Sequence, residues 1–281
     1  MFPAPCSPAA HALQARFSAD MSPPSASVYR ALLAYGGAAA GAEVTLFVVL
    51  IYFFKFATDV LGVSPWWVGS AFALARVWDA VSDPLVGYFS DRTQSRWGPR
   101  RPWIMAGGAA LAPIAFALWA PPSMSEGAMR IWLLLATISF FTAHTAVAIP
   151  LASWGADWAA ASSDRTRAYG ARQIGVLLGM GIGMAFVAPL LGQERIRDEA
   201  FWLALGVAAV GPLLIVSGAL FLADTRVSRA RDGGFDWFRT VVSNPHARTL
   251  LSVRLAAALS SAALSVLGGH VSEHIIGDAS A

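Results

Sequence analysis

Three acidic residues stand inside apolar stretches of the sequence, where a charged side chain is costly. Asp79 and Asp83 belong to the run Arg-Val-Trp-Asp-Ala-Val-Ser-Asp-Pro, and Glu43 follows a stretch of small residues. An ionisable residue inside a membrane span costs roughly 2.5–3.5 kcal/mol on insertion scales, so it indicates function and requires a partner. Because side chains at i, i+3 and i+7 share one helix face, Arg76 is expected beside both aspartates.

The aspartate pair has the chemistry of a proton or cation site. Two carboxylates one helical turn apart repel each other and lose hydration in a low dielectric, which favours uptake of a proton or a hard cation. The hydroxyl of Ser82 adds a further oxygen, and Arg76 could neutralise one carboxylate when no cation is bound. The alternative is that the Arg–Asp pair only fixes helix packing, although three acids are more than one arginine can satisfy.

Glu43 is a second candidate position. It precedes Lys55 by twelve residues, or about 18 Å along a helix. This spacing places Glu43 past the middle of a layer of about 30 Å, toward the cytoplasmic half. We expect it to bind substrate or a cation, and the alternative is a tilted residue close to the membrane interface.

The scaffold that positions these residues must be a membrane-embedded bundle of helices. Only 13% of the 281 residues are charged and 56% are hydrophobic, whereas soluble proteins carry roughly 25% charged residues. This composition excludes a soluble enzyme and a disordered chain, and the single cysteine, Cys6, excludes a disulfide scaffold. The predicted fold class is an all-α, polytopic transmembrane bundle. Helices are expected at 34–57, 65–89, 102–120, 131–152, 170–192, 200–223 and 249–269.

The distribution of arginine predicts the topology. The N-terminal tail and the second, fourth and sixth loops hold fourteen arginines, and the opposite loops hold three. The positive-inside rule therefore places the N-terminus in the cytoplasm. The expected organisation is a disordered tail at 1–30, a six-helix half at 31–223, a cytoplasmic linker at 224–247 and the first helix of an incomplete second half at 248–281.

The run from Trp78 to Trp103 resembles the signature of the glycoside-pentoside-hexuronide:cation symporters, the melibiose-permease-like family of the major facilitator superfamily. The resemblance rests on both aspartates, on Ser-Asp-Arg at 90–92 and on Gly-Pro-Arg-Arg-Pro-Trp at 98–103. Shorter matches extend it: Thr-Asp-Val at 58–60, Ile-Pro at 149–150 and Asp-Arg-Thr-Arg at 164–167. The fold it implies is the N-terminal six-helix half of a major facilitator plus a seventh helix.

By position, the resemblance implies roles for individual residues. Asp79 and Asp83 fall on the cation-site carboxylates of the family, and Thr145 falls near a hydroxyl of the same site. Glu43 falls on a sugar-binding acid, and Arg172 falls on an arginine whose fork of donors suits sugar hydroxyls.

Departures from the family pattern bear on the substrate. Ala148 stands where melibiose permease has a second sugar-binding aspartate, His144 replaces a nearby tyrosine, and Ser82 replaces an asparagine that influences cation choice. These changes keep the transport class, leave the substrate open and favour H⁺ without excluding Na⁺. His144 is expected either to contact substrate or to be a packed polar residue, and Trp154 is expected to line the cavity.

The basic second loop is a separate candidate group. Its arginines could act only as topology determinants. The resemblance implies instead a cytoplasmic gate in which they pair with acids. The residues concerned are Asp91, Arg92, Arg96, Arg100 and Arg101.

The predicted function is secondary active transport, in which entry of H⁺ or Na⁺ is coupled to uptake of a sugar or glycoside by alternating access. We expect no enzymatic activity, no cofactor, no nucleic-acid partner and no metal beyond Na⁺ at Asp79 and Asp83. The expected location is the bacterial inner membrane. Because one expected helix follows the linker, the alternative is a truncated, non-transporting fragment, or a sugar-binding membrane protein that acts through a complementing half or a second copy.

Overall fold

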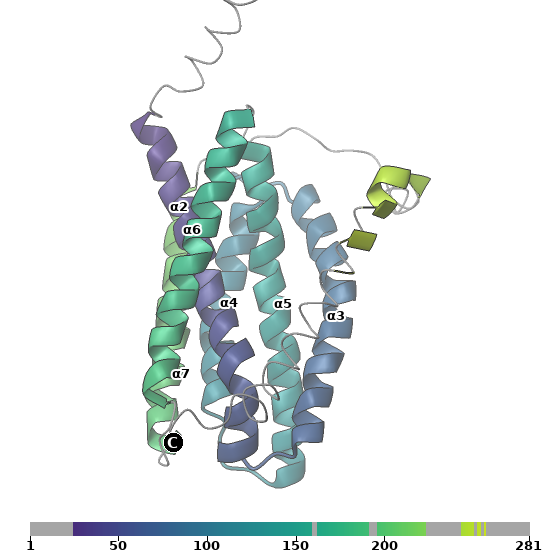
Figure 1. Ribbon diagram of the computed structural model, residues 1–281, viewed down its shortest axis with the longest axis vertical. Helices are drawn as coiled ribbons and strands as arrows, with labels where there is room; N and C mark the ends of the chain where they lie inside the picture. Colours follow the sequence, from purple (N-terminus) through teal and green to yellow (C-terminus); the bar gives the residue numbers. More distant parts are fainter. Residues whose placement is uncertain are drawn as a thin grey trace, which may run out of the picture. The chain divides into compact units, whose positions relative to one another are not determined.

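The computed structural model describes residues 25–158, 162–190, 196–222, 243–249, 252–253 and 256. The chain divides into two units, Met1–Ser228 and Arg229–Ala281, and the elements below lie in the first. The seventh expected helix, at 249–269, falls almost wholly outside the described residues. The helices are α2 (Ala26–Val48), α3 (Pro65–Arg92), α4 (Arg101–Trp119), α5 (Glu126–Trp158), α6 (Ser162–Val187) and α7 (Ile196–Phe221), as Figure 1 shows. Shorter turns are the π-helical η1 (Val49–Phe53) and η2 (Phe56–Val60) and the 3₁₀ turn η3 (Ala188–Leu190).

Proline and glycine set several helix boundaries. Pro65 and Pro102 lie in the first turns of α3 and α4, where a missing N–H costs nothing. The loops before these helices turn at Gly62 and Gly98, whose φ angles are +67° and +81°. Side chains rarely adopt such angles, so glycine is favoured there.

The observed helices match the six expected in this unit, with shifted ends. α2 begins at Ala26, so the last residues of the expected tail are helical. The start follows Pro23 and Pro24, and the sequence after them contains no helix breaker before Gly36. α5 is longer than the expected helix at 131–152 at both ends, and Pro150 lies within it.

Small residues bring α2 into backbone contact with two neighbours. A Cβ on Gly36 would lie 2.9 Å from the carbonyl oxygen of Ala171 on α6. A Cβ on Gly41 would lie 2.8 Å from the amide nitrogen of Ile215 on α7. Close approach of this kind is the usual way in which membrane helices associate. α2 is therefore fixed between α6 and α7 (Figure 1).

The remaining helices extend the bundle from α7. α4 packs against α7 and α5, and α3 packs against α5. The buried core at one end of the bundle is aromatic: the Trp119 ring lies 5.4 Å from that of Phe53 and 5.2 Å from that of Phe56, between ring centroids. α3 depends mainly on α5 for its position, so the α3–α5 interface determines where the charged face of α3 lies.

Five described helices are long and apolar enough to cross a membrane. They are Ala26–Phe53, which joins α2 to η1, together with α4, α5, Asp164–Val187 of α6 and Phe201–Phe221 of α7. α3 has the expected length but is not among them, because Arg76, Asp79 and Asp83 interrupt its apolar sequence. The charged helix is thus carried by an apolar, all-α bundle, as predicted.

Candidate functional site

The two aspartates of α3 have different partners. Asp83 accepts a hydrogen bond from the Thr145 hydroxyl of α5, with 2.9 Å between Oγ1 and Oδ1. Asp79 pairs with Arg76 on its own helix, with 3.2 Å between Nη1 and Oδ2. A hydroxyl and a guanidinium stabilise negative charge to different degrees, so the two carboxylates are not equivalent.

Two buried oxygens beside these contacts have no hydrogen-bond partner among the described residues: Oδ1 of Asp79 and the hydroxyl of Ser82. Positions 79 and 82 are three apart and share a helix face. A buried polar atom without a partner costs about 1–3 kcal/mol. A proton on the carboxyl group, or a cation bound by these oxygens, would offset that cost.

Arg76 has two contacts. Besides Asp79, its guanidinium lies over the ring of Phe141 on α5, with 4.6 Å between Cζ and the ring centroid. Its side chain is 53% exposed. Arg76 can therefore keep a favourable cation–π contact if its bond to Asp79 is lost.

A hydrogen bond that sequence reasoning missed also joins α3 to α5. Nε1 of Trp78 donates to Oγ1 of Thr142, at 2.8 Å. Trp78 precedes Asp79 directly, so this bond helps to fix the rotation of α3 about its axis. The sequence did contain a signal for this bond: the indole N–H of Trp78 lies inside a predicted span, where such a donor needs an acceptor.

Glu43 and Arg172 lie on the other side of the bundle, on α2 and α6. Their charges attract each other, although the structure gives no direct ion pair between them. The Nε atom of Arg172 is buried without a described partner. Glu43 stands directly against α6, since a Cβ on Gly179 would lie 2.8 Å from the Glu43 Cβ. These two predicted substrate residues are brought to one helix pair.

The other two predicted substrate residues lie elsewhere. His144 precedes Thr145 on α5, its ring is stacked 6.3 Å from that of Phe140, and the charge of Arg76 acts on it. It therefore belongs with the α3–α5 group. Trp154 is fully buried against Tyr35, 4.9 Å away between ring centroids. The Trp154 ring also stacks on that of Trp158, 5.5 Å away between ring centroids, so its side chain has no exposed surface in this structure.

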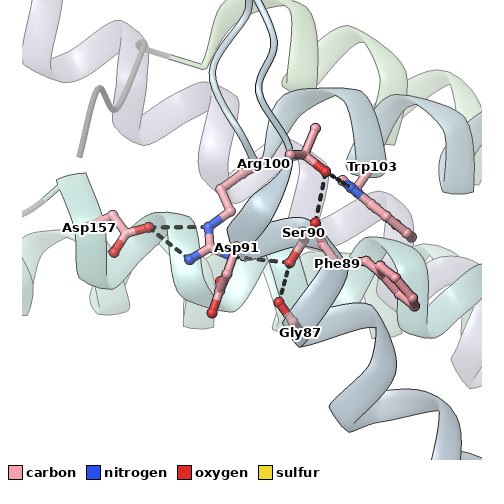
Figure 2. A network of polar contacts seen from close by, with 8 residues as sticks. Gly87, Phe89, Ser90, Asp91, Arg100, Trp103 and Asp157 are labelled. Atoms are coloured by element: carbon pink, nitrogen blue, oxygen red, sulfur yellow. Dashed lines mark hydrogen bonds and ion pairs between the residues drawn. The ribbon is translucent and has the colours of Figure 1, made fainter. Parts of the chain in front are cut away.

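Arg100 organises the second loop (Figure 2). Its side chain is only 11% exposed, and its Nε donates to Oδ2 of Asp157 at 3.1 Å. Its Nη1 donates to the Ser90 hydroxyl at 3.0 Å and to the carboxylate of Asp91. Arg100 thereby joins the ends of α3 and α5 to the start of α4. Sequence reasoning named Arg100 and Asp91 but missed Ser90 and Asp157.

The same loop is also fixed at Trp103. Its Nε1 donates to the Thr93 hydroxyl at 2.8 Å, and that hydroxyl donates to the carbonyl oxygen of Phe89, also at 2.8 Å (Figure 2). The bonds of Arg100 and Trp103 together hold the two ends of the loop near each other.

Three of the four loop arginines contact groups other than carboxylates in the part of the chain that the structure describes, while the acids of the linker at 224–247 lie outside it. Arg101 donates to the carbonyl oxygens of Ala219, at 2.9 Å, and Leu220, so it caps the C-terminus of α7. The partial negative charge of a helix end attracts a cation in the same way as a carboxylate does. Arg92 and Arg96 lie over aromatic rings instead.

The fold and these contacts define a polytopic helical membrane protein in which one charged helix is bonded to an apolar bundle. A family model described as MFS/sugar transport protein matches residues 34–281. The chain therefore belongs to this sugar-transporter family of the major facilitator superfamily, as the sequence predicted.

Named relatives agree with this membership. The chain is 32% identical over 123 residues to the inner membrane symporter YicJ of Escherichia coli, covering 44% of this chain and 27% of that protein. It is 29% identical over 171 residues to the isoprimeverose transporter of Lactiplantibacillus pentosus, covering 59% and 36%. It is 30% identical over 141 residues to the sodium-dependent lysophosphatidylcholine symporter 1 of Xenopus tropicalis, covering 50% and 27%.

The matched segments thus span about a third of the length of these relatives, between 27% and 36%. All three relatives are named as transporters or symporters, which agrees with the prediction that the protein is not an enzyme.

Proposed function

We propose that this protein couples the entry of H⁺ or Na⁺ to the uptake of a sugar or glycoside, and that Asp79 and Asp83 bind the cation. The observation that carries the proposal is the α3–α5 interface. Asp83 is hydrogen-bonded to Thr145, while the buried oxygens of Asp79 and Ser82 have no described partner. Oxygen ligands of this kind suit Na⁺, and a carboxyl group suits H⁺.

In this proposal Arg76 and the cation alternate as the positive partner of Asp79. Without a cation it neutralises Asp79 through the observed contact. A bound cation competes for the same carboxylate, and Arg76 then keeps its contact with Phe141. The Asp79 carboxylate therefore faces a positive charge in both states, which lowers the cost of loading and unloading the site.

For the substrate site we propose Glu43 and Arg172. A carboxylate accepts hydrogen bonds from sugar hydroxyls, and the unpartnered Nε of Arg172 is a donor at the same helix pair. A relative named as an isoprimeverose transporter supports a glycoside as the first substrate to test. The relative named as a sodium-dependent symporter supports Na⁺ as one of the two cations to test. Linkage requires cation and sugar to raise each other's affinity by the same factor.

We also propose the orientation and the division of the chain predicted from the sequence. The protein lies in a bacterial inner membrane with its N-terminus in the cytoplasm. Residues 31–223 form a six-helix half. The residues at 224–247 serve as a linker, and those at 248–281 begin the second half. A second copy or a complementing half is the partner that would complete the transport pathway.

Uptake of labelled isoprimeverose by cells that express the full chain tests the function. The proposal predicts accumulation that a protonophore, or removal of Na⁺, abolishes. Asp79→Asn should abolish accumulation, whereas Glu126→Gln, which removes an exposed acid paired with Arg130, should not. A correctly inserted chain that neither takes up nor binds isoprimeverose would contradict the proposal, whereas binding without uptake would favour the alternative of a sugar-binding membrane protein.

A further inference from the structure

Two arginines at the end of α3 and in the following loop lie over aromatic rings. The Cζ atom of Arg92 is 3.7 Å from the ring centroid of Tyr88, and that of Arg96 is 4.8 Å from the ring centroid of Trp97. Both arginines and Trp97 are exposed. Neither arginine forms an ion pair with a carboxylate of the described residues.

The two following arginines, Arg100 and Arg101, differ from Arg92 and Arg96 in their contacts. Arg100 is buried and uses its donors on Asp91, Asp157 and a hydroxyl, and Arg101 uses its donors on the end of α7. The charges of those two arginines are satisfied inside the protein. The charges of Arg92 and Arg96 have no such partner among the described residues, and both side chains are exposed.

The loop that carries this pair is held in place. The bonds of Arg100 to the end of α3 and of Trp103 to Thr93 fix both of its ends (Figure 2). The rings under Arg92 and Arg96 restrict the guanidinium groups further. Binding of a ligand to these two arginines therefore costs less side-chain conformational entropy.

The position of the loop indicates the ligand. α4, which is apolar enough to span a membrane, begins directly after it at Arg101. The loop therefore lies at the boundary between hydrocarbon and water, at the level of the lipid headgroups. An exposed tryptophan such as Trp97 favours that level. A guanidinium stacked on a ring keeps its N–H edge free, and this edge matches phosphate oxygens in a bidentate manner.

We propose that Arg92 and Arg96, stacked on Tyr88 and Trp97, form a binding site for the phosphate of an anionic phospholipid headgroup. The site is separate from the proposed cation and sugar residues, and it does not require the chain to transport. Charge complementarity selects an anionic lipid over a zwitterionic one, since each basic residue near a membrane surface strengthens binding of anionic lipid about fivefold.

The test measures binding of phosphatidylglycerol and phosphatidylcholine to the purified full chain by native mass spectrometry. Arg92→Gln and Arg96→Gln should each weaken phosphatidylglycerol binding about fivefold, and the double variant about 25-fold, with phosphatidylcholine binding unchanged. The matched control is Arg130→Gln, which removes an arginine whose charge is already paired with Glu126 and should have no effect. Equal phosphatidylglycerol affinity of the double variant and the wild type would overturn the proposal.

Two further variants distinguish a site of defined geometry from attraction by positive charge alone. Replacing both arginines by lysine keeps the charge but removes the planar fork, and Trp97→Leu keeps both charges but removes one ring. Both variants should weaken phosphatidylglycerol binding at least threefold, while full binding in both would show that charge alone is responsible and would refute the site. Inorganic phosphate is the last probe: if it binds as tightly as the lipid, the lipid assignment is wrong.

Discussion

The contact between Gly179 and α2 gives a prediction with an internal control. A Cβ on Gly179 would lie 2.8 Å from the Glu43 Cβ and 3.0 Å from the Ala40 Cα. Neither atom is the end of a flexible side chain, so the helices must move apart. A Cβ on Gly181, two residues further along α6, would meet nothing within 4 Å. Gly179→Ala and Gly181→Ala thus make the same chemical change in different surroundings.

The size of the effect follows from the difference between the two variants. Both gain the helix propensity of alanine, about 0.8–1 kcal/mol, so that contribution cancels. What remains is the overpacking at Gly179, about 1–3 kcal/mol. For a protein of this size 1 kcal/mol corresponds to about 2–4 °C in the unfolding midpoint. Gly179→Ala should therefore unfold about 2–12 °C below Gly181→Ala.

Thermal unfolding of the purified full chain in one detergent measures this difference. Because the displaced atom belongs to Glu43, Gly179→Ala should also weaken glycoside binding, and Gly181→Ala should not. Equal midpoints for the two variants would show that α2 and α6 are not in backbone contact at Gly179, and the packing account would be refuted.

Three other changes test the polar contacts. Asp157→Asn removes the charge-assisted bond between Arg100 and Asp157, and should lower the free energy of unfolding by about 1–2 kcal/mol in thermal unfolding. This value is at the low end for a charged hydrogen bond, because the Asp157 side chain is 26% exposed. An unchanged midpoint would show that the bond does not hold the loop. Trp78→Phe should cost about 0.5–1.5 kcal/mol through its lost hydrogen bond to α5, measured in the same way; stability equal to wild type contradicts this. Thr145→Val should raise the cation concentration for half-maximal uptake about tenfold, because Asp83 loses a donor, and an unchanged value would remove Thr145 from the proposed site.

The helices were predictable from sequence because apolar runs and their punctuation are local properties. Pro65 and Pro102 mark helix starts in any surroundings. The grouping of Asp79 with Arg76 was predictable for the same reason, since helical spacing alone brings i and i+3 together. The structure places these two side chains in contact.

Contacts between distant residues were not predictable in this way. Trp78 and Thr142 are separated by 64 positions, and only the packing of α3 on α5 brings them together. The partners of Arg101 on α7 are backbone carbonyl oxygens, which every residue carries, so no residue type in the sequence marks them. The burial of Trp154 likewise depends on where α2 places Tyr35.

The central claim is that Asp79 and Asp83 bind the cation that drives sugar uptake. Its most direct test is accumulation of labelled glycoside in proteoliposomes that contain the full chain, driven by an imposed pH or Na⁺ gradient. The account predicts accumulation by the wild type, and a loss of at least about tenfold in Asp79→Asn with Glu126→Gln unaffected, because removing the charge removes a cation ligand. Gradient-driven accumulation by Asp79→Asn at the wild-type level would contradict it.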